Sequence, residues 1–273
     1  MICVFLSSSG RHFKVIEHKK NGIVIKQILQ LHDDFMKQHD FHVPLCEKCA
    51  LETGSLFRSL TPDEVEMVNF EKDFRQYKRG DILYQEGNRI SGFYCIHSGI
   101  IKVYKTGFDG KEQIIRFAKP GEIIAYRSVL SNEVACTSAK VIEDCQVCFI
   151  PSEILISLIK TNSSFALDLL KLACHELGEA NSFITDIAQK TVRERLAEIL
   201  LLLVNDFGLD EENYLKISLT REELANIVGT ATESVIRLLS EFKADRLVEL
   251  NGRKIRILNQ KGLEKISNVM ERN

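Results

Sequence analysis

Apolar residues follow two different periods along the chain, and the period changes at Pro151. Before Pro151, glycines separate short runs rich in Ile, Val, Tyr and Phe, as expected of β-strands joined by turns. Asp109-Gly110 predicts a hairpin turn. Strands of this length and spacing fit a β-roll or jelly roll. The predicted strands span residues 81–85, 93–97, 100–105, 113–118 and 145–150.

After Pro151 the apolar residues recur with a helical period, and short helices are expected before a long helix from Ser163 to Lys190. Seven apolar residues of the long helix are spaced alternately four and three apart, which is the spacing of a heptad repeat. This helix seam predicts a homodimer, and the alternative is a helix that packs on its own β-domain. The helix seam consists of Ala166, Leu170, Ala173, Leu177, Ala180, Ile184 and Ile187.

Two more helices are predicted beyond the seam. The first spans residues 192–206, is ended by Gly208, and is expected to pack the two domains together. The second begins at Thr220, which forms a capping box with Glu223, because both side chains can satisfy backbone N–H groups that a first turn leaves unpaired. It ends at Gly229, a residue suited to the left-handed backbone of a tight turn.

A recognition helix is expected from about Thr232 to Phe242, started by a second capping box over residues 230–233. Two helices joined by a glycine turn predict a helix-turn-helix. Strand-like runs at 247–250 and 254–258 flank Asn251-Gly252, which predicts a β-hairpin wing. The alternative is a helical hairpin that binds another protein.

Glu233 and Arg237 lie four residues apart and so share one face of the recognition helix. Arg can donate to guanine and Glu can accept from cytosine, so both are candidates for contacts with bases in the major groove. The alternative is an exposed ion pair between them. The other candidates are Thr232 and Ser234 for phosphates or bases, and Arg253, Lys254 and Arg256 in the wing for phosphates.

Composition narrows the class of protein but does not identify it. A chain of 273 residues can form two modest domains, and 45% hydrophobic with 27% charged residues is typical of a globular protein. The net charge of −2 is uninformative about nucleic acid, so that prediction depends on local features. With no long apolar run and no export signal, no membrane contact and a cytoplasmic location are expected, and the eight cysteines are expected to be reduced.

The order of these elements resembles the family of the cyclic-AMP receptor protein and the fumarate–nitrate reduction regulator, over about residues 46–270. The resemblance implies an α+β protein: a β-roll that responds to an effector or to redox state, a long dimerisation helix, and a winged helix-turn-helix that binds double-stranded DNA. It also implies RNA polymerase as a partner, matches the family's base-contacting Glu and Arg to Glu233 and Arg237, and indicates no enzymatic activity. The matching stretches are 77–80, 86–87, 92–94, 98–99, 120–122, 147–151 and 220–237.

The resemblance argues against cyclic AMP as the effector. Nucleotide-binding members place an Arg-Ser or Arg-Thr pair against the cyclic phosphate, whereas this chain has Ala135-Cys136-Thr137-Ser138 at the matching stretch. The phosphate-binding Arg is therefore missing. Arg127 is near in sequence but does not match that position.

The resemblance also makes an iron–sulfur cluster one interpretation of the cysteines, because redox-sensing members of the family hold such a cluster with several N-terminal cysteines and one central cysteine. Cys46, Cys49 and Cys148 match three ligands, while the remaining ligand falls near Ser55, which departs from the pattern. A zinc site is a second interpretation, and cysteines without metal are a third. The zinc ligands would be His39, His42, Cys46 and Cys49.

Cys145 and Cys148 are not expected to chelate together, because residues three apart on a strand point to opposite faces. The sequence leaves two other functions open: a regulatory module that binds cyclic nucleotides, and a thiol-redox protein that uses Cys46 and Cys49. The second lacks the βαβ pattern that such proteins need. Four parts are expected along the chain. Residues 1–45 form an N-terminal extension that is a candidate for disorder, 46–160 the β-roll, 161–190 the dimerisation helix and 191–273 the DNA-binding domain.

Overall fold

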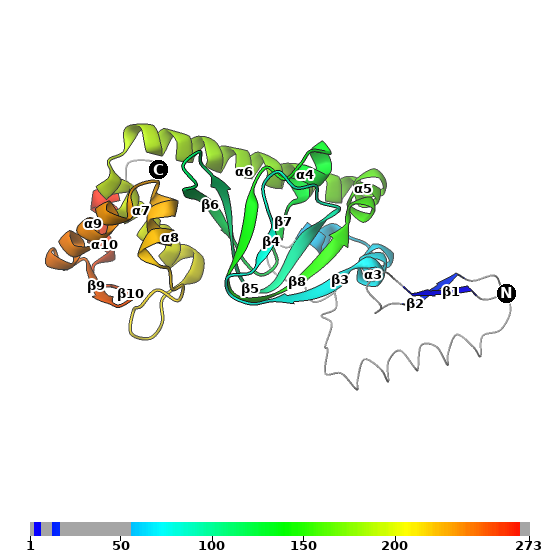
Figure 1. Cartoon of the computed structure of the whole chain (residues 1–273), viewed down its shortest axis with the longest axis horizontal. Helices are drawn as coiled ribbons and strands as arrows, with labels where there is room; N and C mark the ends of the chain where they lie inside the picture. Colours follow the sequence, from blue (N-terminus) through cyan, green and yellow to red (C-terminus); the bar gives the residue numbers. More distant parts are fainter. Residues whose placement is uncertain (1–2, 7–12, 17–55, 268–273) are drawn as a thin grey trace. The chain divides into compact units, whose positions relative to one another are not determined.

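The computed structural model describes residues 3–6, 13–16 and 56–267, and it divides into two compact units, Met1–Pro44 and Leu45–Asn273. In the first unit β1 (Cys3–Leu6) pairs antiparallel with β2 (Phe13–Ile16) (Figure 1). The second unit contains all the other elements. No helix among the described residues is long and apolar enough to cross a membrane.

The β-domain of the second unit is a six-stranded antiparallel sheet with the order β3-β8-β5-β6 (Figure 1). Strand β4 pairs with β8, and β7 pairs with β5. The 3₁₀ helix η1 (Leu56–Ser59) and α3 (Pro62–Glu71) precede the sheet. The strands are β3 (Asp73–Tyr77), β4 (Ile82–Tyr84), β5 (Gly92–Thr106), β6 (Glu112–Ala118), β7 (Ile123–Ile124) and β8 (Ser138–Pro151), with α4 (Tyr126–Ser131) before β8.

The expected strands 93–97 and 100–105 are in fact one strand, β5. Gly99 does not end it but stands at an irregularity in the pairing with β8, with φ of 86°. A Cβ at this position would collide with the backbone oxygen of Asp144, so the glycine permits close approach of two strands. The prediction was wrong here because a glycine in a strand can mark a bulge as well as a turn.

Two apolar cores lie on the two faces of β8. Cys145 is buried with Tyr94 and Val147 in the core of the roll, whereas Cys148 is buried with Phe57 and Leu155 under the helices. The two thiols therefore point into different cores, which confirms the prediction that they do not form a chelating pair.

The change from strand to helix at Pro151 is confirmed, because β8 ends there and α5 (Ser152–Thr161) begins at the next residue. The long helix α6 (Ser163–Gln189) follows, with Asn162 as its N-cap. Phe165 and Leu169 in its first two turns are buried against the β-domain.

The C-terminal elements form a second compact part of this unit, called the head here and defined as residues 192–267. Its helix α7 joins it to the β-domain, since Phe207 packs edge-on against Phe117 of β6, and Asp206 forms an ion pair with Lys119 at 2.9 Å. The expected packing role of this helix is therefore seen. The elements of the head are α7 (Val192–Phe207), α8 (Arg221–Val228), α9 (Thr232–Ala244), β9 (Val248–Asn251), β10 (Lys254–Ile257) and α10 (Gln260–Ser267).

Candidate DNA-binding head, helix seam and β-domain pocket

Helix α8 begins and ends as its sequence predicts. Thr220 accepts from the backbone N–H of Glu223 at 3.0 Å, and the Glu223 carboxylate accepts from the Thr220 N–H at 2.8 Å. At its other end Gly229 has left-handed dihedral angles, φ 72° and ψ 51°. Ala225 and Val235 are both fully buried in the core of the head, where a short side chain lets the two helices cross closely.

The predicted second capping box is wrong. The N-cap of α9 is Ala231, and it makes no side-chain cap hydrogen bond. The backbone N–H of Thr230 instead donates to the Ala225 oxygen at 3.1 Å, so Thr230 still closes α8 and α9 starts one residue later. The first N–H groups of α9 consequently have no side-chain acceptor.

The predicted base-contacting residues lie on the exposed side of α9. Glu233 and Arg237 are exposed, while Val235 and Leu238 face the core. Within the described part of the chain, neither Glu233 nor Arg237 has an ion-pair partner, so the alternative of a pair between them is not formed. Both charged groups are directed away from the protein, together with the half-exposed Thr232 and Ser234 on the first turn.

The wing is a two-stranded hairpin in which Asn251 pairs with Lys254, so its turn is Gly252-Arg253, one residue later than the sequence suggested. Arg253 and Lys254 are exposed. Arg256 instead pairs with Glu249 at 3.2 Å across the two strands. The sequence did not single out Arg221, which donates to the Gly252 oxygen at 2.8 Å and holds the wing turn against the start of α8.

Arg195 is another residue that the sequence analysis missed. Its buried guanidinium donates to Lys190 O at 2.8 Å, Val228 O at 3.0 Å and Gly229 O at 3.3 Å. One cation thus serves carbonyl groups at the ends of both α6 and α8, where helix dipoles favour positive charge. The available signal was an Arg directly before the buried run Leu196-Ala197.

The hairpin between β5 and β6 also contacts the head. Gln113 donates from Nε2 to the Asn226 oxygen at 2.6 Å, and Lys111 donates to the Thr230 oxygen at 2.7 Å. The predicted turn at Asp109-Gly110 is present, with φ of 76° at Gly110. Lys111 and Gln113, which follow this turn, therefore connect the β-domain to the end of α8 and to the turn between α8 and α9.

The large residues of the helix seam are exposed in the single chain. The exposed fraction is 59% for Leu170, 62% for Leu177, 65% for Ile184 and 44% for Ile187. These four side chains therefore do not pack on the chain's own β-domain, which was the alternative to a dimer, whereas Ala173 of the seam packs partly against the β-domain core. Ala166 and Ala173 are half-buried, and Ala180 is exposed.

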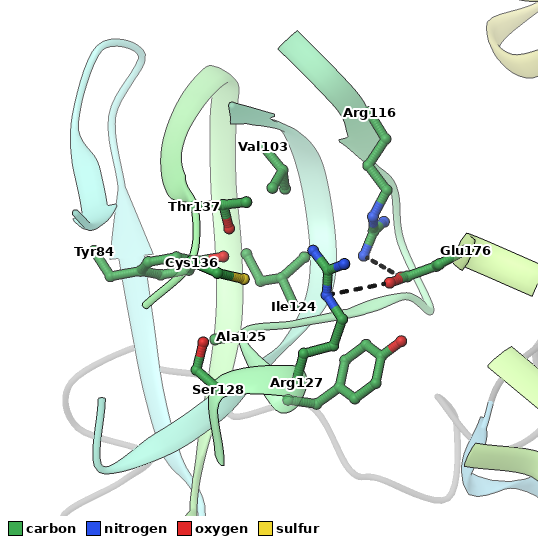
Figure 2. Close-up of a pocket in the computed structure, with 11 residues that line it drawn as sticks. Tyr84, Val103, Arg116, Ile124, Ala125, Arg127, Ser128, Cys136, Thr137 and Glu176 are labelled. Atoms are coloured by element: carbon green, nitrogen blue, oxygen red, sulfur yellow. Dashed lines mark ion pairs between the residues drawn. The ribbon is translucent and has the colours of Figure 1, made fainter. Parts of the chain in front are cut away.

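A small pocket in the β-domain lies where β6, α4 and α6 meet. Figure 2 shows Arg116 and Arg127 converging on Glu176 of α6, with ion-pair distances of 3.1 Å from Arg116 Nη2 and 3.6 Å from Arg127 Nε. Tyr126 also lines the pocket, and burial, followed by the neighbouring Glu176 carboxylate, raises the pKa of its hydroxyl. Cys136 of the 135–138 stretch lines it too. The sequence had singled out Arg127 and Cys136 but not Glu176.

Of the predicted cysteine and histidine ligands, the structure describes only Cys148. Cys148 is buried, whereas His39, His42, Cys46 and Cys49 lie outside the described residues. Among the residues that are described, no group of three or more His, Cys, Asp or Glu side chains is arranged to hold a metal ion.

Comparisons with known proteins match a family model to each half of the second unit. Residues 74–162 match the family model of a cyclic nucleotide-binding domain, and residues 194–266 match that of a Crp-like helix-turn-helix domain. Transcriptional activator protein FnrA of Stutzerimonas stutzeri is 28% identical over 221 residues, covering 80% of this chain and 90% of that protein. The fumarate and nitrate reduction regulatory protein of Vibrio cholerae is 26% identical over 230 residues, covering 82% and 90%.

Solved structures agree on the fold. A putative Crp/Fnr-family regulator from Eubacterium rectale aligns with a TM-score of 0.66 at 23% identity, covering 78% of this chain and 97% of that one. FixK2 from Bradyrhizobium japonicum aligns with a TM-score of 0.63 at 23% identity, covering 71% and 96%. A β-roll, a long helix and a winged helix-turn-helix in this order, with both family models matched, make the chain a DNA-binding transcription regulator of the Crp/Fnr family.

Proposed function

We propose that the chain acts as a homodimer, joined along the α6 helix seam, and that each α9 reads base edges in the major groove with Glu233 and Arg237. One observation carries this proposal: both side chains are exposed one turn apart on α9 and have no ion-pair partner among the described residues. A pair of opposite charges that could neutralise each other, yet point outward, suits Arg-to-guanine and Glu-to-cytosine contacts.

The surroundings of α9 support phosphate contacts beside the base contacts. Ala231 leaves the first N–H groups of α9 without a side-chain acceptor, and a DNA phosphate can accept from them. Arg253 and Lys254 extend from the wing and can neutralise phosphates. Arg256 is engaged with Glu249, so we assign it mainly to holding the wing.

Exposure of the helix seam supports the dimer. Leu170, Leu177 and Ile184 are large apolar residues that water surrounds in the single chain, and a second α6 would bury them. Small alanines between them allow close approach of two helices. A dimer also presents two copies of α9 to half-sites about one helical turn, or roughly 34 Å, apart.

We further propose RNA polymerase as a protein partner, a cytoplasmic location with the DNA target, and no catalytic reaction. The names of the relatives, which are transcriptional activators, support a partner in the transcription machinery. Redox sensing through Cys46, Cys49 and Cys148 stays a prediction that metal analysis tests.

Selection of binding sites from random DNA tests the role of α9. Arg237→Ala is expected to lose about 1–3 kcal/mol of discrimination at one base pair of each half-site, while salt-dependent nonspecific binding persists. Lys243→Ala, at the far end of the same helix, is the matched control and should keep the sequence preference. An unchanged preference in Arg237→Ala contradicts the base contact.

Sedimentation equilibrium tests the dimer. Leu177→Glu places a charge in the middle of the seam and is expected to give a monomer at micromolar concentration, whereas exposed Lys171→Ala should remain dimeric. A monomeric wild-type protein under the same conditions would refute the seam.

A further inference from the structure

Lys111 brings a positive charge of the β-domain to the start of α9, the helix that reads DNA in the proposed function. It lies in the turn between β5 and β6, directly before β6, and its Nζ donates to the backbone oxygen of Thr230 at 2.7 Å. Thr230 directly precedes Ala231, the N-cap of α9. An ammonium group of the β-domain therefore lies beside the recognition helix, although Lys111 and Thr230 are 119 positions apart in the chain.

Other contacts hold the hairpin between β5 and β6 in this place. Gln113 Nε2 donates to the Asn226 oxygen at 2.6 Å, and its Oε1 lies 3.3 Å from the point where a Cβ on Gly229 would stand. Ile114 and Phe117 of β6 are buried in the same apolar core as the residues of the head. The position of the hairpin against the turn between α8 and α9 is thus fixed by packing as well as by the bond from Lys111.

The charge of Lys111 is available to a further partner. Lys105 of the same hairpin pairs with Glu86 at 3.0 Å, whereas Lys111 is exposed and forms no ion pair within the described part of the chain. The Asp109 carboxylate accepts from the backbone N–H of Lys111 at 3.1 Å, inside the turn. A Lys ammonium has three N–H donors, and Thr230 accepts from one of them. Two donors therefore remain for an anion.

We propose that Lys111 binds a DNA phosphate, so that the DNA-contacting surface extends from the head onto the hairpin between β5 and β6. This contact rests on the proposed function, in which the start of α9 enters the major groove and a phosphate lies beside its first turn. Ala231 leaves the first N–H groups of α9 without a side-chain acceptor. A phosphate there accepts from these N–H groups on one side and from the Lys111 ammonium on the other.

A phosphate contact from the β-domain links DNA binding to the docking of the head. Lys111 reaches the phosphate only while the hairpin packs against the turn between α8 and α9. DNA therefore binds this docked arrangement more tightly than one in which the head has moved away, and bound DNA stabilises the docking in return. The contact itself carries no sequence information, because every base pair presents the same phosphate groups.

A salt titration of DNA binding tests the proposal, with the full chain and a DNA duplex that the wild type selects, and with no other protein present. Each neutralised phosphate adds about 0.9 to the slope of log K against log salt concentration, so Lys111→Gln should reduce the slope of a dimer by about 1.8. Its affinity should be roughly 60-fold lower at about 0.1 M salt and should approach the wild-type value near about 1 M. Lys111→Arg keeps the charge and should keep the wild-type slope.

Two further variants separate a direct contact from other effects of the substitution. Lys105→Gln removes the same charge from the same hairpin, at a residue that already pairs with Glu86, and should keep the wild-type slope. Gln113→Ala keeps the charge but removes the hydrogen bond to Asn226. In this background Lys111→Gln should cost less affinity, because the hairpin no longer holds the ammonium beside the phosphate. Sites that Lys111→Gln selects from random DNA should match those of the wild type.

An unchanged salt slope in folded Lys111→Gln overturns the proposal, because loss of a purely structural bond to Thr230 would lower the affinity equally at every salt concentration. An equal change of slope in Lys105→Gln also overturns it, since the charge would then act at a distance and not by contact. Both failures leave the proposed function standing if the wild type selects a DNA sequence and Arg237→Ala loses that preference. A wild-type protein that binds no DNA overturns the phosphate contact and the proposed function together.

Discussion

Arg195 Nε donates to the backbone oxygen of Val228 at 3.0 Å and so ties the start of α7 to the end of α8. The same guanidinium donates to Lys190 O, at the junction that follows α6. The long helix and the helix-turn-helix therefore meet at one buried cation. This arrangement gives a direct physical route from α6 to the position of α9.

Replacement of Arg195 by Met is expected to lower the free energy of unfolding by about 2–4 kcal/mol, because several buried carbonyl groups lose a charged donor. Urea denaturation measures the change. Arg193→Met is the matched control: Arg193 pairs with Glu241 and Asp245 at the surface and should cost less than about 1 kcal/mol. Equal losses in both variants would contradict a special role for Arg195.

Ala231 leaves α9 without a side-chain cap. We expect a capping residue at this position to stabilise the fold, and a negatively charged one to weaken DNA binding as well. Ala231→Ser and Ala231→Asp should each raise the free energy of unfolding by about 0.5–2 kcal/mol, since the backbone already has N-cap geometry. Only the Asp variant should weaken DNA binding strongly, because its charge repels the phosphate. Denaturation and gel shift together provide the readout. An Asp variant that binds DNA as tightly as the wild type would contradict a phosphate at this helix start.

Cys145 makes the folded state sensitive to alkaline pH. Burial raises the pKa of its thiol from 9.0 to about 12. Above pH 9 the unfolded chain releases this proton while the folded chain keeps it, so the contribution to stability is complete below pH 9 and is lost as the pH rises toward 12. We expect Cys145→Ala to show a shallower loss of stability across this range in denaturation experiments. An identical pH slope would show that the thiol does not ionise differently in the two states.

Cys148 separates the interpretations of the cysteines. If Cys46, Cys49 and Cys148 hold an iron–sulfur cluster, Cys148→Ala should remove iron and the visible absorbance from anaerobically purified protein, while Cys145→Ala should retain both. Zinc held by His39, His42, Cys46 and Cys49 should instead survive Cys148→Ala. Wild-type protein free of both metals would leave the cysteines as ordinary thiols.

Local pattern was enough to predict the elements whose ends are specified by neighbouring residues. Thr220, Glu223 and Gly229 define α8 because a cap and a left-handed turn depend only on a few consecutive residues. The heptad spacing likewise predicted the extent of α6, and strand alternation predicted that Cys145 and Cys148 face different cores.

Tertiary structure decided the features that depend on residues far apart in the chain. Whether Gly99 ends a strand or bends it depends on the approach of β8, and whether Thr230 caps α9 depends on its bond to Ala225. Glu176 and Arg116 are 60 positions apart, so no local pattern connects their charges, although the fold places them 3.1 Å from each other. The sequence alone therefore determined the order and type of most elements and the exposed face of α9. The charge cluster of the pocket and the Arg195 junction form only in the folded chain. Their interacting groups are far apart in the sequence, so no local period of apolar or charged residues indicates that they meet.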